Sequence, residues 1–489
     1  MYFCKDLLVH LEYECKCGST DIEVTEVTAD SRKVVQGCMF LCIAGANFDG
    51  HDAAEEVIKK GARVLVVSRD ISVPDGYQVT VIKVKDTRYA MAYIAAAYYN
   101  HPADTLKVIG VTGTKGKTTT AYLVKSILEH AGYHVGLVGT IEAIIGEEKI
   151  PAHNTTPESF LLQQYFRRML DAGCTVCVME VSSQGLMLHR TQGFTFELGI
   201  FTNIEPDHIG PNEHASFEEY MACKGLLFQQ CRKGIVNSDD ERWKTVLQGH
   251  TCEVETFGIQ PGADLRAENL QLIHKPGQPG VEFDVTGLLH FHAVVPTPGI
   301  FSVYNAMTAI AICRHFQVST EDMTAALLQA RVRGRIETVK VSDQFTVMID
   351  YAHNAMALES ILTTLREYHP HRLVCLFGCG GNRSKLRRYE MGEISGKLAD
   401  FTIITSDNPR FEMPEDIIAD IRTGIDKTEG RYIEIPDRRE AIAYAIAQGE
   451  PGDIIVLAGK GHEDYQEIRG VQYPMDERVL ISEILQERK

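Results

Sequence analysis

No stretch of this sequence is apolar for long enough to cross a membrane, and residues 1–6 are not a basic region followed by an apolar core. Positive charge is also scarce, because 49 Lys and Arg stand against 66 Asp and Glu, a net charge of −17. Nucleic acids and anionic membranes bind clustered Lys and Arg, so neither is expected as a main partner. We therefore expect a cytoplasmic protein without membrane insertion, in which anionic ligands meet locally positive pockets.

A disulfide framework is also absent. The 13 cysteines are odd in number and scattered over a long chain, which indicates buried, reduced thiols. Cys174 and Cys177 have no second pair at the spacing of a zinc site, so they are interpreted as core residues.

The chain is too long for one ordinary hydrophobic core. Its 489 residues, of which 44% are hydrophobic and 24% are charged, fit a globular protein of about three domains. Residues 1–101 alternate short strands and helices, and a break at Asn100-His101-Pro102-Ala103 precedes the next part. Helices and β-branched strands then alternate as in a mostly parallel, doubly wound sheet, and a β-rich stretch after Phe257 reads as a flap. The last part repeats strand and helix in a Rossmann-like rhythm.

The predicted fold is therefore α/β with three domains. They are a small N-terminal α/β domain (1–101), a central phosphate-loop domain with the flap (102–331), and a C-terminal Rossmann-like domain (332–489). The turn at Gly378 to Gly381 lacks the complete glycine fingerprint of a dinucleotide site, so none is predicted there.

The clearest chemical signal is residues 108–120, where a β-branched strand stops at glycines and a helical pattern starts near Lys117. Glycines let backbone N–H groups approach an anion, Lys117 can reach the outer phosphates, and Thr118 can hold Mg²⁺. The usual spacing would place a glycine at Val111, and the alternative is a glycine-rich turn with a solvated lysine. We expect ATP or GTP to contact Gly113, Thr114, Lys115, Gly116, Lys117, Thr118 and Thr119.

Two further groups follow predicted strands of the central sheet. Glu180 ends one strand, and Asp207-His208 follow another. Ligands collect at the carboxyl ends of parallel strands, so Glu180 and His208 are candidate Mg²⁺ partners. Taken singly, each fits a capping or hydrogen-bonded loop residue equally well.

Several motifs together resemble those of the Mur ligase family, over the whole chain. They are, in order, residues 113–119, Glu180-Val181-Ser182-Ser183, Asp207-His208, Asn305, Gly334-Arg335-Ile336-Glu337 and Asp350-Tyr351-Ala352-His353. Asp30-Ser31-Arg32 and Asp407-Asn408-Pro409-Arg410 resemble the branch that adds the third residue of the peptidoglycan peptide. The second motif is the version associated with meso-diaminopimelate rather than L-lysine.

The resemblance implies an ATP-dependent ligase of peptidoglycan synthesis. The glutamate carboxylate of UDP-N-acetylmuramoyl-L-alanyl-D-glutamate attacks the γ-phosphorus of ATP, and the amine of a diamino acid then displaces phosphate from the acyl phosphate. Lys117, Glu180, His208 and Lys224 are the expected catalytic residues, and Thr118, Glu180, His208 and Lys224 the expected Mg²⁺ partners. Lys224 would be carbamylated, although sequence alone makes it a solvated helix lysine. Asn305 and Arg335 would contact the nucleotide, and a monomer is expected.

The resemblance also implies that the first domain binds the UDP-sugar substrate, the central domain ATP and the last domain the amino acid, and it assigns their contacts. The UDP-muramoyl dipeptide would meet Ser31, Ala46, Asn47, Phe48, Asn154, Thr155, Thr156, Ser182 and Arg190. Diaminopimelate would meet Arg383, Asp407, Asn408, Pro409, Arg410, Gly459 and Glu463. Arginines grip carboxylates with paired N–H groups, and carboxylates receive ammonium groups, although each charge taken alone fits a surface ion pair.

Some positions depart from the family pattern. They are Lys115, Gln184, Leu188, Ser302, Asn354, Ala355, Asn382 and Ser384. Asn382 and Ser384 stand where aspartates flank Arg383, which leaves open a paralogue that joins L-lysine or another amine or uses another acceptor. A nucleotide-dependent switch without ligase activity is the alternative from a different class.

Overall fold

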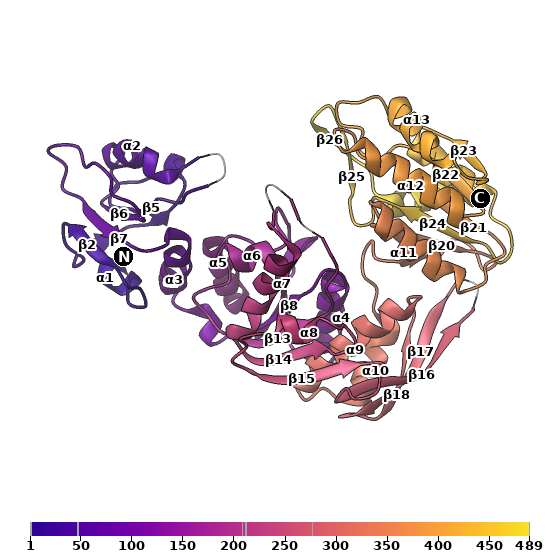
Figure 1. The fold of residues 1–489 in the computed structure, drawn as a ribbon, viewed down its shortest axis with the longest axis horizontal. Coiled ribbons are helices and arrows are strands. Elements are labelled where there is room, and N and C mark those ends of the chain that lie inside the picture. Colours follow the sequence, from indigo (N-terminus) through magenta and orange to yellow (C-terminus); the bar gives the residue numbers. More distant parts are fainter. Residues whose placement is uncertain (1, 46–47, 208, 211–212, 276, 489) are drawn as a thin grey trace. The chain divides into compact units, whose positions relative to one another are not determined.

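The computed structural model describes residues 2–45, 48–207, 209–210, 213–275 and 277–488 (Figure 1). The predictions for Ala46, Asn47 and His208 lie outside these residues. The chain forms two compact units, residues 1–257 with 311–316 and residues 258–310 with 317–489. No helix in the described part is long and apolar enough to cross a membrane.

The first unit begins with a five-stranded sheet of order β2-β7-β6-β5-β4. β5 and β6 lie inside it and every residue of both is buried, which explains their unbroken apolar sequences. The strands are β2 (Glu14–Cys17), β4 (Val27–Thr28), β5 (Met39–Leu41), β6 (Val64–Val67) and β7 (Thr80–Lys83). Around them lie β1 (Tyr2–Phe3) paired with β3 (Glu23–Val24), α1 (Cys4–Leu7), α2 (Ala54–Lys59), α3 (Thr87–Tyr98) and the 3-10 helices η1 (Ser31–Lys33), η2 (Gly50–Ala53) and η3 (Pro102–Asp104).

The same unit holds a larger sheet, with the order β11-β10-β9-β12-β8-β13-β14-β15. Its strands from β9 to β15 run parallel, and β10 and β11 add an antiparallel hairpin at one edge. The strands are β8 (Lys107–Thr112), β9 (Val135–Val138), β10 (Glu142–Ile145), β11 (Glu148–Pro151), β12 (Val176–Glu180), β13 (Phe196–Phe201), β14 (Cys231–Asn237) and β15 (Glu253–Gly258). The helices are α4 (Lys117–His130), α5 (Ser159–Asp171), α6 (Ser183–Met187), α7 (Phe217–Gly225), η4 (Leu226–Gln229) and α8 (Trp243–Val246).

The strand order reverses at β8. From β8 the chain crosses through α4 to β9 on one side, whereas β13 and β14 follow on the other side. Right-handed crossovers in opposite directions place helices on both faces, and the reversal leaves a crevice at the carboxyl ends of the strands. The phosphate-loop sequence lies directly after β8, at this point.

The second unit contains an antiparallel meander of β16 (Leu265–Ile273), β17 (Gly280–Gly287) and β18 (Phe291–Val295). α9 (Ile300–Arg314) and α10 (Thr320–Gln329) follow in sequence, and the last residues of α9 belong to the first unit. The meander confirms the β-rich character predicted after Phe257.

A six-stranded sheet of order β19-β20-β24-β21-β22-β23 forms the core of the second unit. All strands run parallel except β19. The strands are β19 (Glu337–Val339), β20 (Thr346–Asp350), β21 (Leu373–Phe377), β22 (Phe401–Ile404), β23 (Tyr432–Glu434) and β24 (Ile454–Ala458). The helices are α11 (Ala355–Arg366), α12 (Lys385–Leu398), α13 (Pro414–Ile425), α14 (Arg438–Ala447) and α15 (Glu477–Glu487), and β25 (Tyr465–Ile468) pairs with β26 (Val471–Pro474).

The α/β class and the mostly parallel sheets are confirmed. All 13 cysteines are free, and ten of them, including Cys174 and Cys177, are buried as predicted, whereas Cys15 and Cys17 are exposed and Cys252 is partly exposed. The domain limits at residues 101 and 331 stay predictions. Sequence alone predicted that Lys224 is a solvated helix lysine, and this prediction is wrong. The side chain is buried, because α7 packs it beneath the phosphate loop.

Candidate active site

The phosphate loop joins β8 to α4 and is held open by glycines. Gly113 has φ +150°, and a Cβ there would overlap the hydroxyl of Thr202. Gly116 has φ +85° immediately before α4 begins at Lys117. Because glycine has no side chain, it adopts these positive φ values easily and lets the loop turn tightly. The turn leaves backbone N–H groups at the N-terminus of α4, where anions are favoured.

Asn203 fixes this loop from the end of β13. Its side-chain oxygen accepts from the Lys115 N–H at 2.9 Å, and its amide donates to the Lys115 carbonyl at 3.1 Å. The Lys115 ammonium lies 2.8 Å from the carboxylate of Glu205 and is partly exposed. The Thr202 hydroxyl also donates to the Lys115 carbonyl at 2.8 Å, so the loop backbone is held by bonds that do not involve the Lys115 side chain.

Two lysines meet beneath the loop. Lys117 Nζ donates to the carbonyl oxygens of Gly113 and Thr114 at 2.8 and 3.0 Å, and Lys224 Nζ donates to the same Gly113 oxygen at 3.0 Å. Lys224 is 1% exposed, with its amine 4.3 Å from the ring centre of Tyr220. Burial first, and then the charge of Lys117, lower the pKa of Lys224 well below that of an ordinary lysine.

Glu180 is the buried carboxylate of the site. Its Oε2 accepts from the hydroxyls of Thr118 at 2.9 Å and Thr140 at 3.0 Å, and its Oε1 accepts from the Thr140 N–H at 2.8 Å. Gly139 leaves the space for that carboxylate, because a Cβ there would overlap Oε1.

A carboxylate and a hydroxyl oxygen in contact are a donor set that suits Mg²⁺. Among the residues that the structure describes, no cluster of three or more His, Cys, Asp and Glu gathers at one point. Two protein oxygens fit Mg²⁺, since this ion keeps several waters and binds substrate phosphates.

Four of the residues predicted to contact the UDP-substrate gather beside Glu180. Thr156 donates its hydroxyl to the Glu180 carbonyl at 3.0 Å and accepts from the Ser182 N–H at 2.9 Å. Arg190 donates to the Thr156 carbonyl at 3.0 Å, and the hydroxyls of Thr155 and Thr140 lie 3.1 Å apart. The Ser182 hydroxyl also caps α6. Asn154 is exposed nearby in sequence, whereas Ser31 and Phe48 belong to the N-terminal sheet region and make none of these bonds.

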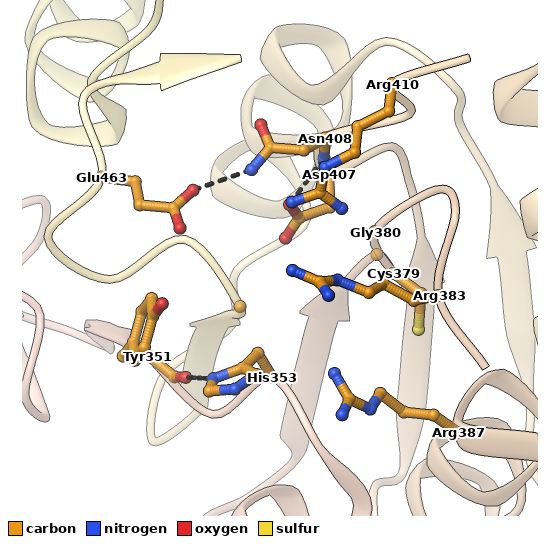
Figure 2. Close-up of a pocket in the computed structure, with 12 residues that line it drawn as sticks. Tyr351, His353, Cys379, Gly380, Arg383, Arg387, Asp407, Asn408, Arg410 and Glu463 are labelled. Carbon is orange, nitrogen blue, oxygen red and sulfur yellow. Dashed lines mark hydrogen bonds between the residues drawn. The ribbon is translucent and has the colours of Figure 1, made fainter. Parts of the chain in front are cut away.

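The second unit contains a cavity of about 300 Å³ at the carboxyl ends of its parallel strands (Figure 2). Six of the seven residues predicted for the amino acid line it, and Pro409 does not. The lining residues are Tyr351, His353, Gly378, Cys379, Gly380, Arg383, Arg387, Asp407, Asn408, Arg410, Gly459 and Glu463.

Lys460 organises the acidic side of this cavity, although it does not line it. The fully buried Lys460 ammonium donates to Asn408 Oδ1 at 2.9 Å and Glu463 Oε2 at 2.8 Å. Asn408 Nδ2 donates to Glu463 Oε2 at 2.9 Å. These bonds fix the orientation of the Asn408 amide and leave Glu463 Oε1 for a ligand. At the neighbouring Gly459 φ is +109°, and a Cβ would lie 2.9 Å from Asp407 Oδ2.

The motifs at residues 334–337 and 350–353 pack together in the same unit. Asp350 Oδ2 accepts from the Ile336 N–H at 2.8 Å, and the guanidinium of Arg335 lies 4.9 Å from the ring centre of Tyr351. Burial raises the pKa of Asp350. Asn305 lies on α9, and neither Asn305 nor Arg335 belongs to the unit that holds the phosphate loop.

Three family models match the chain. Residues 23–99 match "Mur ligase family, catalytic domain", residues 111–313 match "Mur ligase middle domain", and residues 334–461 match "Mur ligase, glutamate ligase domain". The chain is also 43% identical over 488 residues to UDP-N-acetylmuramoyl-L-alanyl-D-glutamate--2,6-diaminopimelate ligase 1 of Clostridium acetobutylicum, covering 99% of each. The chain belongs to the Mur ligase family. This Mur ligase thus shares the ATP-dependent, amide-forming chemistry of its family.

Other relatives are also similar to this Mur ligase over nearly its whole length. A ligase of the same name from Caldanaerobacter subterraneus is 43% identical over 484 residues, covering 99% of this chain and 98% of the relative. A solved structure titled as this 2,6-diaminopimelate ligase has a TM-score of 0.75 at 28% identity, covering 100% and 99% of the two chains. MurF of Thermotoga maritima, with a TM-score of 0.60 at 18% identity over 95% of this chain, shares the fold.

Sequence reasoning missed several residues that shape both sites. Thr140 follows β9, and Asn203 follows β13. Both are polar residues just after a buried parallel strand, and this pattern could have predicted them. Arg387 lies one helical turn beyond the predicted Arg383, and Lys460 lies between the predicted Gly459 and Glu463. No sequence pattern reveals that Lys460 is buried.

Proposed function

We propose that this Mur ligase adds meso-diaminopimelate to UDP-N-acetylmuramoyl-L-alanyl-D-glutamate, with ATP, through an acyl-phosphate intermediate. The observation that carries the proposal is one cavity in which arginines, carboxylates and an oriented amide converge. A diamino dicarboxylic acid carries both charges at each end, and Arg383 and Arg410 suit its carboxylates while Asp407 and Glu463 suit its ammonium groups. The names of relatives 40–43% identical over almost the whole chain support the same reaction.

The chemistry proposed for the phosphate loop needs no protein nucleophile. The substrate carboxylate attacks the γ-phosphorus and ADP leaves, and the incoming amine then displaces phosphate from the acyl carbon. Both reactants of the first step are anions, so catalysis rests on positioning and on cations. Gly113 to Thr119 would cradle the phosphates, and Lys117 would turn from its loop carbonyls to the γ-phosphate. Asn305 and Arg335 would complete the nucleotide contacts.

Thr118 and Glu180 would hold Mg²⁺, with His208 as a further partner. When bound, this ion neutralises phosphate charge and orients the phosphate oxygens. Ser31, Ala46, Asn47, Phe48, Asn154, Thr155, Thr156, Ser182 and Arg190 would bind the UDP-muramoyl dipeptide.

We propose that Lys224 is carbamylated. A neutral amine adds to CO₂, an N–C bond forms, and one proton leaves to give an anionic carbamate. The lowered pKa of Lys224 supports this step, because it favours the neutral, nucleophilic form of the amine. The product places an anion beside Lys117 that supports a metal.

We also propose that the enzyme is a monomer, which sedimentation velocity tests. Because ATP and the UDP-linked substrate are cytoplasmic metabolites, we place the reaction in the cytoplasm.

The decisive experiment supplies ATP, Mg²⁺ and UDP-muramoyl dipeptide with single amines, and weighs the products. We expect a product larger by one diaminopimelate residue, with ADP and phosphate released in equal amounts. If L-lysine or another amine is joined instead, the proposed specificity is wrong. If ATP is hydrolysed at the same rate without acceptor and amine, the chain is a nucleotide-dependent switch.

The second candidate, a ligase for another amine, is favoured by one observation. Asn382 and Ser384 provide no carboxylates beside Arg383, and Asn382 instead accepts from the Phe411 N–H at 3.1 Å. The amine panel separates this candidate from the first.

A further inference from the structure

Tyr220 lies on α7, one helical turn before Lys224, and its side chain is 1% exposed. Residues four positions apart share one face of a helix, and the Lys224 amine accordingly lies 4.3 Å from the centre of the Tyr220 ring. The ring therefore packs directly against the lysine that lies beneath the phosphate loop.

The Tyr220 hydroxyl contacts the phosphate loop itself. Its oxygen lies 3.1 Å from Thr114 Oγ1. The Thr114 hydroxyl has one proton, which it donates to the Glu205 carbonyl at 3.3 Å, and Oγ1 also accepts from the Glu205 N–H at 3.0 Å. Because Oγ1 has a second lone pair, Tyr220 is the donor in the bond to Thr114.

A third segment packs against the same tyrosine. The ring centres of His214 and Tyr220 lie 5.2 Å apart, and His214 Nε2 lies 2.8 Å from Ser183 Oγ. Ser183 is the first residue of α6, which the Ser182 hydroxyl caps. Tyr220 thus lies where the phosphate loop, α7 and the start of α6 meet.

Packing alone does not explain the hydroxyl of Tyr220. The core cluster that contains Tyr220 also contains Leu227, Phe228 and Val246, and a phenylalanine at position 220 would fill the same space. A buried hydroxyl costs free energy unless it forms a hydrogen bond. The bond to Thr114 is therefore a feature that a tyrosine provides here and a phenylalanine does not.

We propose that Tyr220 is a positioning residue of the nucleotide site, because its hydroxyl holds Thr114 and so fixes the phosphate loop against α7. The loop then keeps its shape for the phosphates while Lys224, on the same helix, stays 3.0 Å from the Gly113 carbonyl. This inference rests on the proposed function, in which the loop binds ATP, and adds to it a residue that acts on ATP through Thr114.

The test is a double-mutant cycle in the full-length enzyme, in which calorimetry measures the dissociation constant of AMP-PNP with Mg²⁺. Tyr220→Phe keeps the ring and removes the hydroxyl, and we expect the dissociation constant to rise about fivefold because one buried hydrogen bond is lost. Thr114→Val removes the acceptor of that bond. In the Thr114→Val background, Tyr220→Phe should change the dissociation constant by less than about twofold, because no bond to Thr114 is left to lose.

Steady-state kinetics provide a second readout. Tyr220→Phe should raise KM for ATP by a similar factor and leave KM for the amine within about twofold of the wild-type value. A general loss of folded enzyme would instead lower the rate at every substrate concentration without this difference between the two KM values.

Tyr133→Phe is the matched control. It also removes one tyrosine hydroxyl in the same unit, which donates to the Phe316 carbonyl at 2.7 Å. Tyr133 lies just beyond the C-terminal end of α4, at the opposite end of that helix from the phosphate loop. We expect its dissociation constant and both KM values to equal those of wild type, and circular dichroism checks that every variant is folded.

The outcomes separate the inference from the proposed function. If Tyr220→Phe leaves the dissociation constant unchanged, or raises it equally in both backgrounds, the positioning role is overturned while the proposed function stands. If wild type binds AMP-PNP but joins no amino acid to the UDP-muramoyl dipeptide, the proposed ligase function is overturned, and the cycle still decides the role of Tyr220. If wild type does not bind AMP-PNP, both are overturned.

Discussion

Lys117 and Lys224 donate hydrogen bonds to one acceptor, the carbonyl oxygen of Gly113, at 2.8 and 3.0 Å. Two ammonium groups at one oxygen repel each other, and Lys224 is the more deeply buried of the two. The arrangement favours a neutral Lys224 amine, which is the form that reacts with CO₂.

Carbamylation gives the first prediction. Enzyme stripped of CO₂ should lose most of its ligase activity and regain it on addition of bicarbonate, and Lys224→Met should be at least about 100-fold less active and insensitive to bicarbonate. With ¹³C-bicarbonate, wild type should give a carbamate carbon signal by NMR that the variant lacks. A fully active, bicarbonate-supplied enzyme without that signal would show that Lys224 acts unmodified.

Thr140 gives the second prediction, through its hold on Glu180. Thr140→Val keeps the shape and the backbone N–H but removes the hydroxyl that donates to Glu180 Oε2. Loss of a hydrogen bond to a metal-binding side chain typically weakens metal binding about 10- to 100-fold. The Mg²⁺ concentration for half-maximal activity should therefore rise by about tenfold. Thr140→Ser keeps the hydroxyl and is the control. Equal Mg²⁺ requirements in all three proteins would contradict a role for this bond.

The third prediction separates the loop backbone from the Lys115 side chain. Asn203→Ala removes the two Asn203 side-chain bonds to the Lys115 backbone and leaves the one from the Thr202 hydroxyl, and we expect KM for ATP to rise about tenfold. Lys115→Asn keeps both bonds and removes only a partly exposed pair with Glu205, which is worth about 1 kcal/mol or less. Its effect on KM should be several-fold smaller, and steady-state kinetics at saturating acceptor and amine measure both. An equal or larger effect of Lys115→Asn would assign phosphate binding to that ammonium.

Sequence patterns predicted much of the fold because the central strands are buried on both faces. Every residue of β12 and β24 is buried, and both are continuous apolar runs except for Glu180 at the end of β12, so their type and position follow from composition alone. The hairpins β10–β11 and β25–β26 were missed. β11 and β26 expose nearly all of their residues, so neither is marked by a buried apolar face and their pairing depends on contacts between segments.

The residues of the candidate sites also fall into two groups, those that a local sequence pattern predicts and those that it does not. Glycines before a helix and a carboxylate at the end of a strand are local signals, and they placed Lys117 at the start of α4 and Glu180 at the end of β12. Contacts between distant segments are not local. The burial of Lys224 and the bond from Thr140 to a carboxylate 40 residues away arise only when strands assemble.

The fourth prediction concerns the buried Lys460. Lys460→Met removes one of the donors that orient Glu463 and Asn408, so KM for the amine should rise at least about tenfold while KM for ATP changes little. Removing one partner of a buried pair also costs about 3 kcal/mol of stability. Tyr465→Phe keeps the carbonyl that Lys460 contacts and should behave as wild type. Loss of stability with an unchanged amine KM would reduce Lys460 to a purely structural role.

The last prediction is a pH dependence of stability that arises from His462. Burial, and then the nearby guanidinium groups of Arg335, Arg333 and Arg478, lower the pKa of His462 to about 4 from 6.5. Because the unfolded chain binds this proton more tightly than the folded one, the free energy of unfolding decreases as pH falls from about 6.5 to about 4. At about 1.4 kcal/mol per pKa unit, the decrease reaches roughly 3 kcal/mol.

His462→Gln should flatten this part of the profile without changing the slope above pH 7. The urea midpoints of wild type and variant, measured from pH 7.5 to 4.0, test this, and His290→Gln, at an exposed position of the same unit, should keep the wild-type profile. Parallel profiles for wild type and His462→Gln would mean that His462 takes up its proton without loss of the folded state, so that carboxylates alone set the acid limit of the enzyme.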